Sequence, residues 1–101
     1  MEIKAQLKKL GYKIRYAPAK VIGAHIACYY VEYKGKRIRP RAAMKLKIPL
    51  NEIWISNKYK AKAEKILDHE LCEIEYRWKG YSGKLAHKKA QKDDSRGRLL
   101  K

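Results

Sequence analysis

Residues 66–90 read ILDHELCEIEYRWKGYSGKLAHKKA, and they decide how the second half of the chain folds. Neither glycine nor proline interrupts residues 58–79, so we predict one long helix there, ended by Gly80. The short turn WKGYSG follows, and a second helix is predicted near residues 84–93. Because the connection is so short, the second helix is expected to fold back against the first.

The first half of the chain has the patterns of a short helix followed by strands. Residues 5–13 (AQLKKLGYK) predict a helix that stops at Gly11, because glycine readily takes the left-handed conformation that ends helices. Residues 12–16 (YKIRY) alternate with the period of a strand. Residues 21–40 are rich in β-branched and aromatic side chains and predict a hairpin that turns at residues 34–36.

Residues 51–56 (NEIWIS) predict one more strand. We place it at the edge of the sheet, because it is short and follows Pro49, which cannot donate to a strand ladder. Residues 41–49 fit either a short helix or a connector. These elements predict an α+β fold with a small twisted sheet, in a single domain that covers residues 1–101.

The chain is strongly basic overall, but its acidic residues are concentrated in one segment. It has 26 Lys and Arg against 10 Asp and Glu, a formal net charge of +16, which raises nucleic acid as a partner. A heat-adapted intracellular protein can have a similar composition with a merely solvated surface. Half of the acidic residues nevertheless fall within residues 64–75, so that segment has its own requirement for carboxylates.

The sequence favours a soluble, cytoplasmic protein. It has no apolar run long enough to span a bilayer, and residues 1–13 lack the apolar block of a signal peptide, so no membrane insertion is expected. Cys28 and Cys72 form no CxxC pair, which argues against a cysteine-built zinc site. In a reducing compartment both are expected to be free, buried thiols.

One face of the predicted long helix combines apolar and chemically reactive residues. The apolar members are Ala63, Ile66, Leu67, Leu71, Ile74 and Trp78. Glu70 falls within this stripe, where a charge removed from water requires a compensating partner. His69 and Glu73 are four residues apart, so their side chains lie side by side and can hold one metal ion. Zinc accepts both ligand types, and a catalytic zinc site uses three protein ligands.

His87, on the second predicted helix, is the candidate third ligand. With His69 and Glu73 it would complete an open zinc site, and Glu70 would act as general base toward the metal-bound water, whose pKa zinc lowers to about 7. Simpler interpretations exist: Glu73 pairs with a nearby lysine or arginine, and His87 is a surface histidine. His25 lies in a strand-like run and is interpreted as structural or as lining a cleft.

Within residues 53–90, the strand IWIS, the helix with HELCE, the glycine turn and the helix with AHKKA resemble the minigluzincins. These are very short soluble zinc peptidases of the gluzincin group, and a histidine on the second helix is their distinguishing ligand. The resemblance implies a zincin-like fold, Zn²⁺ as cofactor and hydrolysis of peptide or protein substrates. It assigns His69, Glu73 and His87 as metal ligands and Glu70 as general base.

The resemblance also implies that the strand with Ile53, Trp54 and Ile55 is the edge along which an extended peptide substrate pairs. The chain departs from the wider zincin pattern at Glu73, where that class has histidine. A carboxylate ligand adds negative charge to the metal and is expected to weaken it as a Lewis acid.

Minigluzincins are latent, with a C-terminal segment that occupies the cleft within one molecule or between two. Residues 92–101 are the corresponding segment here. Leu99 and Leu100 would fill substrate pockets, and Asp93 or Asp94 would approach the metal in place of water. Exchange of the last helix between subunits would produce a homodimer.

Two other functions compete with a peptidase. The first is a nucleic-acid-binding module that combines the positive charge with a face of aromatic side chains. The residues of that face would be Tyr29, Tyr30, Tyr33, Trp54 and Tyr59. The second is a non-catalytic scaffold that keeps zinc for stability alone.

Overall fold

Five α-helices and a four-stranded sheet make up residues 3–95, which a computed structural model describes, with side chains as far as Gln91. The elements are α1 (Ile3–Lys9), β1 (Lys13–Ala17), α2 (Ala19–Ile22), β2 (Ala27–Tyr33), β3 (Lys36–Ile38), α3 (Arg41–Leu46), β4 (Glu52–Ser56), the 3₁₀ helix η1 (Asn57–Lys62), α4 (Ala63–Trp78) and α5 (Gly83–Ser95). The predicted α+β class is confirmed. The open choice for residues 41–49 is resolved as a short helix, α3.

The strand order is β1-β4-β2-β3, which corrects the predicted place of residues 51–56. The strand they form, β4, is not an edge: it pairs in parallel with β1 and antiparallel with β2. Pro49 does not prevent this, because it precedes the first residue of β4 and removes no donor from either ladder. Side chains cover both faces of β4, so it is suited to the middle of the sheet.

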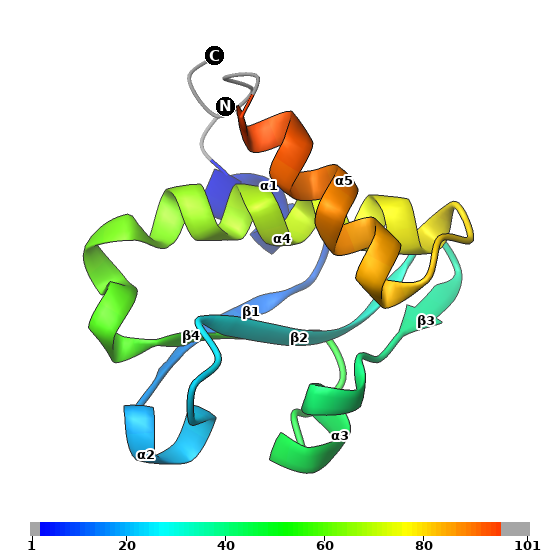
Figure 1. Cartoon of the computed structure of the whole chain (residues 1–101). Helices are drawn as coiled ribbons and strands as arrows, with labels where there is room; N and C mark the ends of the chain where they lie inside the picture. The colour runs from blue at the N-terminus through cyan, green and yellow to red at the C-terminus, as the bar shows by residue number, and fades with distance from the viewer. Residues whose placement is uncertain (1–2, 96–101) are drawn as a thin grey trace.

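Alternate residues of β2 face two different hydrophobic clusters. Tyr29, Val31 and Tyr33 point into the main core, together with residues of α1 and α4. Cys28 belongs to a smaller cluster with residues of α3. Figure 1 shows the same division, with α1, α4 and α5 on one face of the sheet and α3 beyond the other. The predicted hairpin is confirmed by the antiparallel pairing of β2 with β3. Its first strand begins only at Ala27, because Ala19–Ile22 form the short helix α2, so His25 precedes the strand.

The long helix begins later than predicted. Residues 57–62 form η1, and α4 starts at Ala63 and ends at Trp78, just before Gly80 with its positive φ of 107°. The backbone of Tyr59, at φ −113° and ψ 20°, is not helical and puts a kink inside η1. Lys62, at φ −108° and ψ 19°, precedes α4 as its N-cap and separates it from η1. The Ser56 side chain accepts a hydrogen bond from the Lys58 backbone N–H at 3.4 Å, which caps η1.

Helix α5 confirms the predicted second helix and lies against α4 (Figure 1). Ala86 and Ala90 are fully buried, and small side chains at these positions allow the two helices to approach closely. At the start of α5, a Cβ atom on Gly83 would meet Arg77 Nη1 at 2.6 Å. The backbone of α5 extends through residues 92–95 of the segment expected to confer latency, whereas Leu99 and Leu100 lie outside the described residues.

Candidate metal centre

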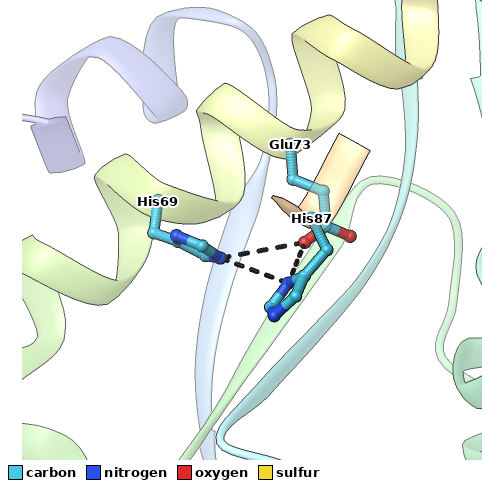
Figure 2. Close-up of side chains that lie close together, drawn as sticks. All are labelled: His69, Glu73 and His87. Atoms are coloured by element: carbon cyan, nitrogen blue, oxygen red, sulfur yellow. Dashed lines mark hydrogen bonds and ion pairs between the residues drawn. The ribbon is translucent and has the colours of Figure 1, made fainter. Parts of the chain in front are cut away.

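Three potential ligands converge where α5 crosses α4. His69 and Glu73 are one turn apart on α4, and His87 reaches them from α5, as Figure 2 shows. His87 Nδ1 lies 3.1 Å from Glu73 Oε2 and 3.4 Å from His69 Nε2, and His69 Nε2 lies 3.9 Å from Glu73 Oε2. The structure therefore brings together the three residues predicted from the sequence to be metal ligands.

The spacing of these atoms fits a single small ion. Donor atoms at about 2.0–2.2 Å from a tetrahedral zinc ion lie about 3.3–3.6 Å from one another. The three separations, 3.1, 3.4 and 3.9 Å, bracket that range before any adjustment. The His69 and Glu73 side chains are only 18% and 13% exposed, while that of His87 is 52% exposed. One side of the group is thus open to solvent or to a ligand.

Glu70 is buried, as its position in the apolar stripe predicted. It is 7% exposed and one of two buried polar or charged residues among those described. Glu70 and the three potential ligands line one cleft of about 810 Å³. His25 lines the same cleft, which agrees with one of the two interpretations given to it. The cleft is therefore lined by a buried carboxylate as well as by the three potential ligands.

Strand β2, and not β4, runs along this cleft. Residues 24–29 line it, whereas Ile53, Trp54 and Ile55 do not appear among its lining residues. Ile53 and Ile55 are fully buried beneath the helices. Strand β3 pairs with β2 only from Val31 onward, so among the described strands none pairs with the outer edge of residues 27–30. The strand that lines this cleft is therefore β2, and not β4, which carries the residues predicted to form a substrate edge.

A tyrosine that the sequence pattern does not link to this site contacts one of the three potential ligands. The Tyr29 hydroxyl donates a hydrogen bond to Glu73 Oε1 at 2.9 Å. Burial raises the pKa of Tyr29, and the nearby charges of Glu73 and Glu70 raise it further, so the hydroxyl keeps its proton. Nothing in the local sequence links two residues 44 positions apart, so only the tertiary structure reveals this contact.

Cys28 is a second group at the cleft whose titration is shifted. Burial raises the pKa of its thiol to about 11, with a further contribution from the charges of Glu70 and Glu73. A neutral thiol is a poor metal ligand. Both Cys28 and Cys72 are free and buried, as predicted.

The aromatic face predicted for nucleic-acid binding is incomplete. Tyr29 and Tyr33 are 1% and 8% exposed and belong to the main core, so neither can stack on a base. Tyr33 instead packs edge to face against Trp78, with ring centroids 6.3 Å apart. The prediction that Tyr29 and Tyr33 are exposed was wrong because every second residue of β2 faces the helices, and both tyrosines are at such positions.

Within residues 3–95, no helix combines the length and the apolar character needed to cross a bilayer. Comparison of the chain with protein-family models, curated proteins and solved structures finds no match.

Proposed function

We propose that this protein is a zinc-dependent metallopeptidase. One observation carries the proposal: the donor atoms of His69, Glu73 and His87 lie within 4.8 Å of one another, at a cleft that is also lined by the buried Glu70. Two imidazoles and one carboxylate are a ligand set found in catalytic zinc sites, where the fourth coordination position is left for water or substrate. The resemblance of residues 53–90 to the minigluzincins supports the same assignment.

His69, Glu73 and His87 would hold the ion. A zinc ion supplies a Lewis acid and lowers the pKa of a coordinated water to about 7. Because Glu73 brings a negative charge to this ligand set, we expect tight binding but slower turnover than with a third histidine. His87 is the only one of the three that comes from α5, so it links the two helices at the site.

Glu70 would act as the general base. It directly follows a ligand in sequence and lines the same cleft, and its carboxylate would take the proton of the attacking water. The same group would then return the proton to the leaving nitrogen of the peptide. Burial favours this role, since it limits competition from bulk water for the proton.

A peptide substrate would lie along the outer edge of β2. Residues 24–29 line the cleft, and backbone pairing with an extended peptide is a common mode of peptide recognition. The lining includes small side chains, Ala24 and Ala27, which leave room for the side chains of a substrate. Residues 92–101 would block this edge in a latent form, within one chain or through a homodimer that exchanges α5.

The test is metal-dependent peptide hydrolysis by the full chain and by a chain ending at Ser95, whose folding is checked by circular dichroism. We expect cleavage of an unstructured protein such as casein after zinc is added, its loss with a chelator, and its loss in Glu70→Gln with zinc retained. A matched variant, His25→Ala, changes a cleft residue outside the proposed ligand set and should retain zinc. Zinc-independent cleavage, or equal rates in Glu70→Gln and the unsubstituted chain, would refute the proposal.

Two alternatives have their own support. The net charge of +16 favours nucleic-acid binding, which should weaken steeply with added salt. Binding that is absent, or insensitive to salt, would remove this alternative. The link between α4 and α5 through His87 favours a zinc-stabilised scaffold, for which zinc would raise stability while neither chain cleaves any peptide.

A further inference from the structure

Tyr29 lies at the point where the main core meets the potential metal ligands. It is 1% exposed, and its ring packs in the main core beneath α4. Only its hydroxyl reaches the site, where it donates to Glu73 Oε1 at 2.9 Å. A hydrogen bond from a neutral donor to a carboxylate is stronger than one between two neutral groups, particularly when it is buried.

This contact gives the two oxygens of Glu73 different partners. Oε1 accepts from Tyr29, whereas Oε2 faces the two imidazoles, 3.1 Å from His87 Nδ1 and 3.9 Å from His69 Nε2. The carboxylate is 13% exposed, so water has little access to compete for either oxygen. The side chain is therefore held in one orientation, with a single oxygen toward the potential ligands.

We propose that Tyr29 is a positioning residue: its hydroxyl keeps Glu73 Oε1 in a hydrogen bond, so that Oε2 is the one oxygen of this carboxylate available to the metal. This inference rests on the metal site of the proposed function. It accounts for the HELCE motif, in which a carboxylate stands where histidine is usual. A ligating histidine is oriented by donating its second N–H group to a neighbour, but a carboxylate has no proton to donate. Its orienting partner must be a donor, and the Tyr29 hydroxyl is one.

The test compares Tyr29→Phe with Tyr12→Phe in the full chain. Tyr12 is also buried, and its hydroxyl also donates one hydrogen bond of 2.9 Å, but to the backbone carbonyl of Glu32. The two variants lose the same chemical group, and only one of them loses it at Glu73. Urea denaturation without metal checks that both variants fold.

The readouts are the zinc dissociation constant, from competition with a chromophoric chelator, and the visible absorption of the cobalt(II)-loaded protein. Tyr29→Phe should weaken zinc binding by about 10- to 100-fold, the range for loss of a partner that orients a ligand. It should also lower the cobalt(II) absorption, because a released Oε1 can join the metal and raise the coordination number from four to five. Tyr12→Phe should match the unsubstituted chain in both readouts.

Unchanged affinity and an unchanged cobalt(II) spectrum in Tyr29→Phe would overturn the inference while leaving the metal site intact. Equal losses in Tyr29→Phe and Tyr12→Phe would also overturn it, since they would reflect general destabilisation. Absence of metal binding by the unsubstituted chain would overturn both this inference and the proposed function.

Discussion

Substitution of His87 by alanine separates metal binding from folding. The His87 side chain is 52% exposed, and its described polar contacts are to Glu73 and His69. A polar contact made by a half-exposed side chain contributes at most about 1 kcal/mol, so the metal-free variant should be nearly as stable as the unsubstituted chain. The stabilisation of the fold by zinc, in contrast, should be much smaller in the variant, because His87 is the only proposed ligand on α5.

The size of that difference follows from linkage. An ion that binds only the folded state stabilises it by about 2.7 kcal/mol when its free concentration is about 100 times the dissociation constant. For a domain of this size, each 1 kcal/mol raises Tm by about 4–8 °C, so zinc should raise Tm by roughly 10–20 °C. In His87→Ala only two proposed ligands remain, His69 and Glu73 on α4. At the same zinc concentration we therefore expect most of this rise in Tm to disappear.

The assay is thermal denaturation followed by circular dichroism, with a metal-buffered zinc series and a chelated reference. His25→Ala is the matched control, because His25 lines the same cleft without belonging to the proposed ligand set, and it should keep the full rise in Tm. An equal rise in the unsubstituted chain and in His87→Ala would refute the idea that α5 supplies a ligand. Loss of the rise in His25→Ala as well would show that the ligand set is wrongly assigned.

Three further predictions concern other residues of the site and core. Glu70→Gln should retain the rise in Tm with zinc and lower peptide hydrolysis by about 10²- to 10⁴-fold, as measured from initial rates; retained hydrolysis would exclude Glu70 as the base. Because burial raises the folded-state pKa of Cys28 from 9.0 to about 11, its contribution to stability should be complete below pH 9 and lost as the pH rises toward 11. Urea denaturation at several pH values should therefore show a shallower decline between pH 9 and 11 in Cys28→Ala, and an unchanged slope would contradict the shift. Leu67→Ala, at a fully buried position of the main core, should lower the free energy of unfolding by about 2–5 kcal/mol; a loss below 1 kcal/mol would contradict the packing.

The parts of the fold that depend on local pattern could be predicted from the sequence. The helix after Gly80, the hairpin at residues 34–36 and the burial of Glu70 all follow from periodicity and turn chemistry, which act over a few residues. The convergence of His87 with the α4 pair was also accessible, because a short turn leaves the next helix few directions in which to go. These predictions required no knowledge of the sheet.

The order of the strands could not be predicted in this way. The predicted edge position of residues 51–56 was wrong because strand order depends on contacts between distant segments. Both strands that pair with β4, namely β1 and β2, lie far from it in the sequence. The contact of Tyr29 with Glu73 escaped prediction for the same reason. The sequence pattern also predicts Tyr29 and Tyr33 on an exposed aromatic face, because only the pairing of β2 shows which of its faces meets the helices.

X-ray absorption at the zinc edge of the full chain, loaded with one equivalent of zinc, would identify the metal ligands themselves. We expect about one bound zinc per chain, with scattering from two imidazoles and from oxygen and none from sulfur. The imidazole signal should fall by half in His87→Ala. Failure to bind zinc, or a shell that contains sulfur from Cys28 or Cys72 in place of imidazole, would contradict the assignment of His69, Glu73 and His87 as the metal centre.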